Sequence, residues 1–196
     1  FEIGGGCESP RVAAEMITRP NPEAGFTTQA NTICALDSAK FVDQSSFNGV
    51  GKLSFSWNFG VAQSSKASPK VQFPQAAGEF VVSQAVVSDF GCSDTARKPV
   101  DINARPEVDF KVVEACEGTP TQLLDSSRFP GLGSVNYRWE VQNQVYNKVN
   151  PKHTFTSSQS PSVELVVTSN AGCADTMKKQ AAINPTPQAQ YSVNNA

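Results

Sequence analysis

The five cysteines of this chain are its residues best suited to covalent chemistry, because a thiol can form a disulfide, bind a metal or act as a nucleophile. Cys7, Cys92 and Cys173 each follow a glycine in similar surroundings, and Cys34 and Cys116 lie upstream of the last two. The spacing is 58 residues from Cys34 to Cys92 and 57 from Cys116 to Cys173. We therefore predict two structural bridges, Cys34–Cys92 and Cys116–Cys173, and place the partner of Cys7 outside this fragment. No Cys-x-x-Cys pair favours zinc, and bonds between units instead of within them would contradict this prediction.

The single histidine, His153, is a candidate general base or metal ligand. Catalysis by histidine normally needs an activated partner and a group that orients the ring. We find no such set, and no Gly-x-Ser-x-Gly element, phosphate-binding loop or zinc-protease helix motif. We therefore interpret His153 as a turn residue tied to the local backbone, assign no catalytic residue and predict that the chain is not an enzyme.

Two aspartates, Asp43 and Asp125, are weak candidates for calcium ligands, with Asp94 and Asp175 as further carboxylates. Calcium prefers six to eight oxygen ligands, usually including several carboxylates, and the chain has no Asp-x-Asp-x-Asp cluster. The interpretation that we favour is that these side chains accept backbone hydrogen bonds at tight turns. We therefore expect no cofactor and no metal, with calcium as the alternative.

The chain repeats itself with a period close to 82 residues, which is typical of a tandem array. Shifts of 82 or 81 positions superimpose equivalent residues: Cys34 on Cys116, Asp43 on Asp125, Trp57 on Trp139, and Cys92 on Cys173. We expect four segments: the last strand of a preceding repeat in residues 1–20, complete repeats in 21–104 and 105–185, and the start of a following repeat or a linker in 186–196. Proline in the short connections favours extended, semi-rigid links between repeats.

The residues discussed above lie in or next to stretches with the sequence pattern of β-strands. Residues 53–59 and 135–141 alternate apolar and polar side chains with period two. Residues 79–87 and 162–168 are rich in valine, as buried strands are. About seven short strands in each repeat of roughly 80 residues predict an all-β fold of two-sheet sandwiches. We expect Trp57 and Trp139 to be core residues.

Composition narrows the environment and the partners. Charged residues make up 17% of the chain and the net charge is −2, with no basic face for nucleic acid. No apolar run approaches the roughly 20 residues of a membrane helix, so no membrane insertion is expected in this segment. A disulfide in each repeat would stabilise a small core by about 4 kcal/mol in the chain-entropy model. Such bonds indicate an extracellular or cell-surface location.

These motifs together resemble the PKD (polycystic kidney disease) repeat, in the cysteine-bearing form found in surface adhesins of Bacteroidetes-type bacteria. The resemblance rests on residues 41–45 (Phe-Val-Asp-Gln-Ser), 123–127 (Leu-Leu-Asp-Ser-Ser), 57–60 (Trp-Asn-Phe-Gly) and 150–155 (Asn-Pro-Lys-His-Thr-Phe), and on the Gly-Cys-x-Asp strand starts. It implies immunoglobulin-like, PKD-type sandwiches in tandem. The Gly-Asp-Gly of the family is replaced by residues 60–62 (Gly-Val-Ala) and 142–144 (Gln-Asn-Gln), which weakens any metal site inferred from relatives.

We expect the chain to be a non-catalytic spacer or stalk segment of a long repeat-containing surface adhesin, with adjacent repeats of the same chain as its partners. In relatives this architecture occurs in attachment and gliding proteins. The alternative is a module that binds a polysaccharide or a surface protein, possibly as an accessory region of a secreted hydrolase. Exposed loop aromatics would favour the alternative, and the candidates are Phe47, Phe90, Phe129 and Tyr146.

Overall fold

The computed structural model describes residues 18–192, and these contain β-strands without any helix. Accordingly, no helix long and apolar enough to cross a membrane occurs in that part of the chain. The strand expected for a preceding repeat, apart from residues 18–20, and Cys7 lie outside the described residues. The same holds for residues 193–196 of the segment expected to begin a following repeat.

Strands β1 to β8 form one body, which we call the first sandwich. Its smaller sheet has the order β1-β3-β6 and its larger sheet the order β2-β8-β7-β4-β5. The strand bounds are β1 Phe26–Thr28, β2 Ile33–Cys34, β3 Ser38–Asp43, β4 Leu53–Asn58, β5 Gln63–Ser64, β6 Lys70–Gln72, β7 Gly78–Ser88 and β8 Ser93–Asn103. All neighbours are antiparallel except β2, which lies parallel to the end of β8.

Strands β9 to β17 form the second sandwich, with sheets of order β14-β11-β9 and β13-β12-β15-β16 and the parallel pair β10-β17. The strand bounds are β9 Phe110–Val112, β10 Ala115–Cys116, β11 Pro120–Asp125, β12 Val135–Val141, β13 Gln144–Tyr146, β14 Lys152–Thr154, β15 Ser162–Ser169, β16 Ala174–Gln180 and β17 Ile183–Asn184. β16 and β17 together take the place that the long strand β8 has in the first sandwich.

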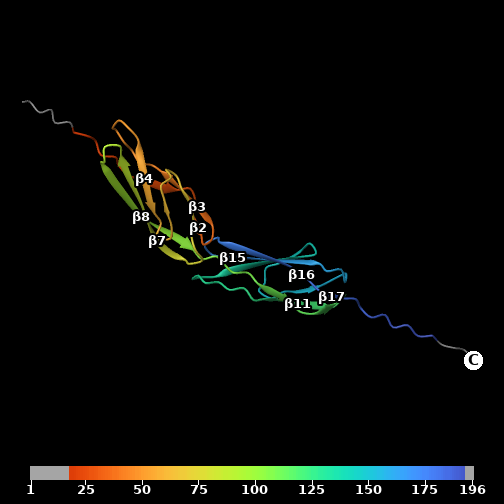
Figure 1. Ribbon diagram of the computed structural model, residues 1–196. Helices are drawn as coiled ribbons and strands as arrows, with labels where there is room; N and C mark the ends of the chain where they lie inside the picture. The colour runs from red at the N-terminus through yellow and green to blue at the C-terminus, as the bar shows by residue number, and fades with distance from the viewer. Residues whose placement is uncertain (1–17, 193–196) are drawn as a thin grey trace, which may run out of the picture.

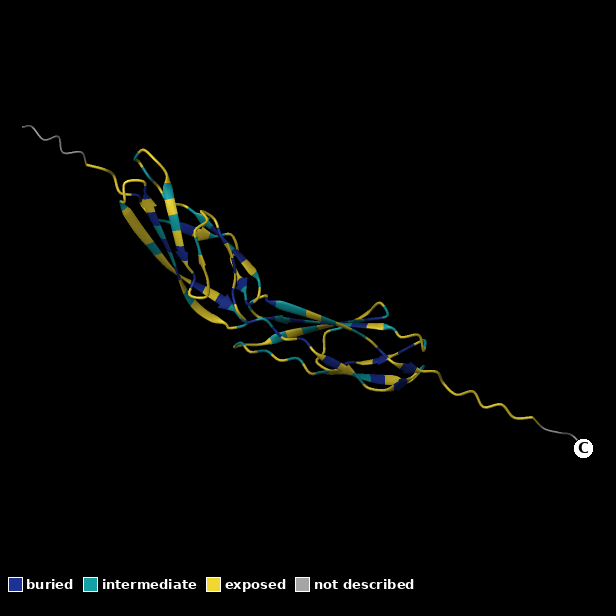
Figure 2. Ribbon diagram, in the orientation of Figure 1, coloured by how far each residue is buried: buried dark blue, intermediate teal, exposed yellow. Residues whose placement is uncertain are grey.

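Each sandwich has its own hydrophobic core between its sheets (Figure 2). Trp57 and Trp139 are 1% and 0% exposed, so the prediction that both are core residues is confirmed. Each indole meets the ring of the first strand edge-on at a centroid distance of 5.1 Å, Phe26 in one sandwich and Phe110 in the other. Burial of such a ring stabilises a fold by about 1.5–3 kcal/mol.

The predicted all-β fold is confirmed, because the alternating stretch 135–141 forms β12 and the stretch 53–59 forms β4 except for its last residue. The valine-rich stretches form β7 and β15. The structure contains eight and nine strands instead of about seven, since two-residue pairings such as β2 and β10 leave little trace in a hydrophobic pattern. The two sandwiches follow one another along the molecule, with residue 18 near one end and residue 192 near the other (Figure 1).

Candidate functional site

The cysteines mark the junction between the two sandwiches as the site to consider. A disulfide joins Cys34 of the first sandwich to Cys173 of the second, 139 positions apart in the chain, with a Cα–Cα distance of 5.6 Å. Of the cysteines in the described part of the chain, Cys92 and Cys116 carry no disulfide. The predicted bridges Cys34–Cys92 and Cys116–Cys173 are therefore wrong, and so is the expectation of one bridge inside each unit.

The length of the last strand explains why the predicted pairing fails. Cys34 lies on β2, opposite Asn103 at the end of β8, whereas Cys92 precedes the first residue of β8. Eleven residues of strand separate the two positions, or about 36 Å at 3.3 Å per residue. A disulfide needs Cα atoms within about 7 Å. The two cysteines of one sandwich thus lie at opposite ends of it.

Polar contacts hold the connection between the sandwiches against the first one. Arg105 donates from Nη2 to Asp37 Oδ1 at 2.8 Å, and the half-buried guanidinium lies at the start of the connection. Gln75 Nε2 donates to the carbonyl oxygen of Arg105 at 3.1 Å. The Cys173 sulfur lies 3.9 Å from the carbonyl oxygen of Asn103. Residues on both sides of the connection therefore restrict its motion.

A close approach of side chains to Gly131 completes the junction. A Cβ atom built on Gly131 would lie 2.6 Å from the Ala104 Cβ and 2.6 Å from the Phe129 ring, so the position accepts only glycine without a shift of its neighbours. Beside it, a cleft of about 360 Å³ lies between the sandwiches, with Gly78, Ile102 and Ala104 on one side and Phe129, Leu132 and Ala171 on the other. Residues of both sandwiches form the cleft, so it exists only while the two sandwiches are in contact.

The two aspartates that were weak calcium candidates take part in hydrogen bonds at turns. Asp43 Oδ1 accepts from the backbone N–H of Ser45 at 3.0 Å and from Gln84 Nε2 at 2.6 Å. Asp125 Oδ1 accepts from the backbone N–H of Ser127 at 3.0 Å. The predicted turn role is confirmed for both. Within residues 18–192 no group of three or more His, Cys, Asp and Glu side chains is arranged to hold a metal ion.

The Gly-Cys-x-Asp motif ties the first strand of each sandwich in place. Asp94 Oδ2 accepts from the backbone N–H of Ala24 at 2.8 Å, and Asp175 Oδ2 accepts from that of Val108 at 3.1 Å. The bond to Ala24 holds the pKa of the Asp94 carboxyl below its usual value. The predicted role at tight turns is wrong for Asp94 and Asp175, because their partners lie 70 and 67 positions away in the chain. The recurrence of Asp two residues after Gly-Cys was a signal for the role in holding the first strand.

Two equivalent lysines, also missed, support the same first strand. Lys98 Nζ donates to the carbonyl oxygen of Phe26, and Lys179 Nζ donates to that of Phe110 and to the Asp109 carboxylate. Each ammonium also lies 5.1 Å from the centroid of the ring on that strand. The ion pair with Lys179 is the main cause that lowers the pKa of Asp109. The 81-residue period relates the two lysines and could have identified them.

His153 is 3% exposed and lies on β14 among side chains, so the interpretation of a turn residue tied to the backbone is wrong. Its Nε2 lies 3.0 Å from Gln142 Oε1 and its Nδ1 lies 2.9 Å from the Tyr146 hydroxyl. An amide oxygen only accepts, so Nε2 carries a proton that it donates to Gln142. The Tyr146 hydroxyl has one proton and lies within hydrogen-bond distance of both Gln144 Oε1 and His153 Nδ1, so it donates to one of the two at a time. Burial lowers the pKa of His153. The ring is therefore a neutral core residue with a partner within hydrogen-bond distance of each nitrogen.

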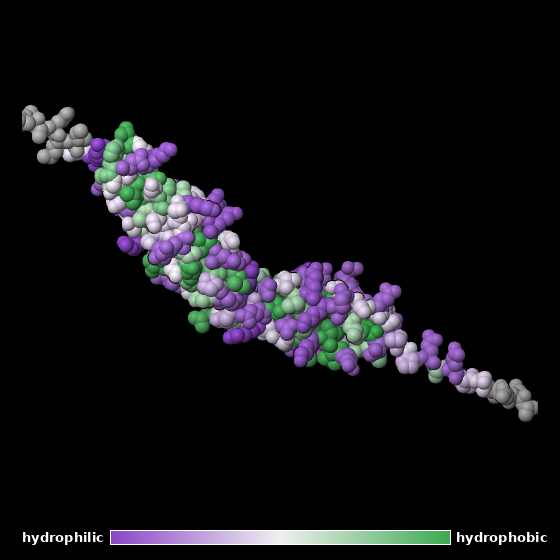
Figure 3. All heavy atoms as spheres, viewed as in Figure 1, coloured by the Kyte–Doolittle hydropathy of each residue, from purple (hydrophilic) through white to green (hydrophobic). Residues whose placement is uncertain are grey.

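Of the four aromatics considered for ligand stacking, Phe90 is the exposed one, at 47%. The guanidinium of Arg19 lies over its ring at 3.5 Å. Phe47, Phe129 and Tyr146 are half-buried. Figure 3 shows hydrophilic residues and smaller hydrophobic areas interspersed over the face in view.

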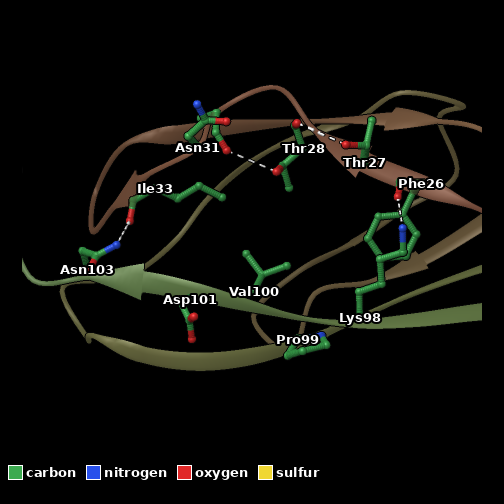
Figure 4. A pocket seen from close by; sticks show the side chains of 11 residues that line it. Phe26, Thr27, Thr28, Asn31, Ile33, Lys98, Pro99, Val100, Asp101 and Asn103 are labelled. Atoms are coloured by element: carbon green, nitrogen blue, oxygen red, sulfur yellow. Dashed lines mark hydrogen bonds between the residues drawn. The ribbon is translucent and has the colours of Figure 1, made fainter. Parts of the chain in front are cut away.

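A polar groove of about 420 Å³ lies beside the first strand of the first sandwich (Figure 4). Hydroxyl, amide, ammonium and carboxylate groups line it, contributed by Thr27, Thr28, Asn31, Lys98 and Asp101. Phe26 also contributes to the lining but is 2% exposed, so its ring offers no stacking platform. These groups suit hydrogen bonds to a hydroxyl-rich ligand. Lys98 already donates a hydrogen bond to the carbonyl oxygen of Phe26.

No protein-family model matches this chain, and no curated protein matches it. Among solved structures, the chain is similar to the PKD1 domain of Epp from Vibrio anguillarum, with 25% identity, a TM-score of 0.39, and coverage of 44% of this chain and 99% of that one. It is similar to the PKD1 domain of the Vibrio cholerae metalloprotease PrtV, with 27% identity, a TM-score of 0.37, and coverage of 42% and 98%. It is also similar to an I-band fragment of titin, with 9% identity, a TM-score of 0.43, and coverage of 86% and 67%. The β-sandwich fold of this chain is established by its own sheets.

Proposed function

We propose that this chain is a non-catalytic extracellular spacer, a stalk segment of a long repeat-containing surface adhesin. Its two sandwiches are consecutive repeats of the 82-residue period. The observation that carries the proposal is the Cys34–Cys173 disulfide, which joins the sandwiches across their junction. A covalent bond at the junction suits a spacer, because it fixes the end of one sandwich to the start of the next.

The bond gives the spacer a limit to its extension. When the two ends of the chain are pulled apart, the force passes through the disulfide and bypasses the 139-residue span between the cysteines. A fully extended span of that length would measure about 480 Å at roughly 3.5 Å per residue. Strands β1 and β2 before the bridge and β16 and β17 after it still carry the load, whereas the residues between the two cysteines cannot be extended while the bond is intact. The disulfide therefore sets an upper limit to the reach of the stalk.

The chemistry of the side chains supports a location outside the cytoplasm and a role without catalysis. A disulfide between domains persists in an oxidising compartment, such as the cell surface or the medium. His153 is neutral and buried, with a partner within hydrogen-bond distance of each nitrogen. Asp43 and Asp125 serve turns, so each candidate for catalysis or metal binding has a structural task.

The polar groove beside β1 favours a second function, recognition of a polysaccharide. Its hydroxyl, amide and charged groups offer hydrogen bonds to sugar hydroxyls. Sugar-binding sites usually add an exposed aromatic platform, which Phe26 does not supply. The groove therefore ranks below the junction as an indication of function.

Single-molecule force spectroscopy on the oxidised chain, held by its two ends, tests the spacer proposal. We expect the oxidised chain to unfold to a contour shorter by the 139-residue span than the Cys34→Ser, Cys173→Ser double variant. The Cys92→Ser variant is the matched control and should extend like the unaltered chain. Equal extension of oxidised chain and double variant would contradict the proposal. Saturable polysaccharide binding that is lost on Asn31→Ala would favour the groove instead.

A further inference from the structure

Within residues 18–192, the two cysteines without a disulfide, Cys116 and Cys92, occupy the same structural positions as the bonded Cys34 and Cys173. Cys116 lies on β10 opposite Asn184, as Cys34 lies on β2 opposite Asn103. The residue after each cysteine donates its backbone N–H to that asparagine carbonyl, at 2.9 Å from Glu117 and 2.8 Å from Ala35. At the junction, the Cys173 sulfur lies 3.9 Å from the Asn103 carbonyl. The end of the second sandwich thus presents an exposed thiol in the setting that holds a disulfide at the end of the first.

At the opposite end of the molecule, Cys92 lies in the same kind of turn as Cys173, the other partner of the junction disulfide. Ser88 N–H donates to the Cys92 carbonyl at 2.9 Å, as Ser169 N–H donates to the Cys173 carbonyl at 2.8 Å. The glycine before each cysteine has positive φ, 81° at Gly91 and 86° at Gly172, so the same turn presents both thiols. Cys173 is 1% exposed under the first sandwich, whereas Cys92 is only half-buried.

Apolar side chains around Cys92 extend the equivalence from a thiol to a surface. Val50 and Phe90 are 75% and 47% exposed at this end of the first sandwich. By the shifts of 82 and 81, they correspond to Leu132 and Ala171, which line the junction cleft of the second sandwich. Leu132 is itself 97% exposed, whereas Ala171 is half-buried at the junction. Within residues 18–192, the equivalence of the two faces therefore rests on the positions of Phe90 and Ala171.

We propose that Cys116 bonds to the Gly-Cys cysteine of a following unit of this kind and that Cys92 bonds to the first-strand cysteine of a preceding one, so that one disulfide spans every junction. The proposal rests on the proposed function, in which the chain is part of a repeat array. Residues 187–191 (Pro-Gln-Ala-Gln-Tyr) resemble residues 106–110 (Pro-Glu-Val-Asp-Phe), which lead into the second sandwich. The occupant of each open end is accordingly a sandwich of the same type.

Each bond forms by exchange with an oxidised disulfide such as glutathione disulfide. One cysteine thiolate attacks the oxidant and releases one reduced thiol, and the second cysteine thiolate then displaces the other. Two cysteine thiols lose two protons and two electrons, the oxidant gains both electrons, and one sulfur–sulfur bond replaces another. Bonds that alternate in this way along an array overlap one another, so each sandwich is tied to both neighbours.

A three-unit chain tests the proposal directly. Residues 1–186 are followed by residues 106–196, which appends a second copy of the second sandwich in register with the natural connection, and the appended copy carries Cys116→Ser so that the chain contains Cys116 once. The chain is oxidised in a glutathione redox buffer, alkylated and mapped without reduction. We expect Cys116 to be bonded to the second copy of Cys173 and to be lost from alkylation. The matched control is the same chain with Cys116→Ser, in which the second copy of Cys173 should be alkylated.

The outcomes separate this proposal from the spacer function. Alkylation of Cys116, or its pairing with any cysteine other than the second copy of Cys173, overturns the proposal, while the Cys34–Cys173 bond in the same sample leaves the spacer function standing. Loss of Cys34–Cys173 as well would overturn the spacer function too, because the junction itself would be absent.

Discussion

The two sandwiches place a turn aspartate at the same point and surround it with different side chains. In the first, the buried Gln84 donates its amide to Asp43, and the neighbouring strand carries Phe55. In the second, Leu165 occupies the place of Gln84 and is 0% exposed. Tyr137 replaces the phenylalanine, and its pKa is raised by burial and by the nearby Asp125 carboxylate. In this pair, the buried polar side chain occurs where the aspartate accepts its hydrogen bond, and an apolar side chain occurs where it does not.

A second difference concerns the hairpin after the tryptophan strand. Gln142 and Asn143 both have positive φ, 44° and 64°, as a two-residue hairpin between β12 and β13 requires. This turn brings Gln142 to His153, which takes the place of Val71 in the first sandwich. The first sandwich uses Gly60 at φ 79° instead and keeps an apolar core there. In the second sandwich, the turn residue Gln142 and the buried His153 thus occur together and contact each other.

Removal of the Cys34–Cys173 disulfide should have the largest effect on the stability of the two sandwiches. The Cys34→Ser, Cys173→Ser double variant should lower the free energy of unfolding by up to about 5 kcal/mol in the chain-entropy model for a loop of 139 residues. The two sandwiches should then unfold separately. Denaturant unfolding under non-reducing conditions measures both effects. Cys92→Ser should change neither, and an equal loss in that control would contradict the account.

Exchanging the buried residues beside the two aspartates should give unequal effects. Leu165→Gln should destabilise the second sandwich by about 3 kcal/mol, because it loses apolar burial and leaves a buried amide in an apolar setting. The reciprocal Gln84→Leu should cost less, since Asp43 keeps its bonds to Ser45. Tryptophan fluorescence during denaturation reports on each sandwich, through Trp57 and Trp139. A Gln84→Leu variant as unstable as Leu165→Gln would refute this reasoning.

The two tryptophans should respond differently to replacement by phenylalanine. Trp139 Nε1 donates to the Lys148 carbonyl at 3.0 Å, whereas no acceptor within residues 18–192 reaches Trp57 Nε1. Trp139→Phe should therefore be about 1 kcal/mol more destabilising than Trp57→Phe. Thermal or chemical unfolding of the two variants, followed by circular dichroism, measures the difference. Equal losses would show that the Lys148 hydrogen bond contributes no net stability.

Acidification should produce the smallest difference, confined to the second sandwich. Burial lowers the pKa of His153 below its usual value of 6.5, so the unfolded chain takes up a proton more readily than the folded one. The stability contributed by the neutral ring is complete above that usual value and declines as the pH falls through the window below it. Unfolding measured from about pH 7 to about pH 5 should show this slope, and His153→Val should remove it. A slope that persists in the variant must come from other groups.

Much of the fold was predictable from local patterns. The alternation that predicts β4 and β12 survives because each strand has one buried face and one exposed face. The strands β2 and β10 were not predictable, since two residues carry no period and only the parallel neighbour defines them. The contacts of His153 were hidden for a similar reason: they depend on a hairpin that brings Gln142 back across the strand.

By itself, the sequence determined the repeat, the alternating strands, the two tryptophan cores and the turn role of Asp43 and Asp125, because these depend on neighbours that are close in the chain or equivalent by the period. Only the tertiary structure decided which sulfur atoms meet. The separations of 58 and 57 residues measure distance along the chain, whereas an eleven-residue strand holds the two cysteines of the first sandwich at opposite ends of it. The end of one sandwich then lies against the start of the next, and Cys34 meets Cys173 there.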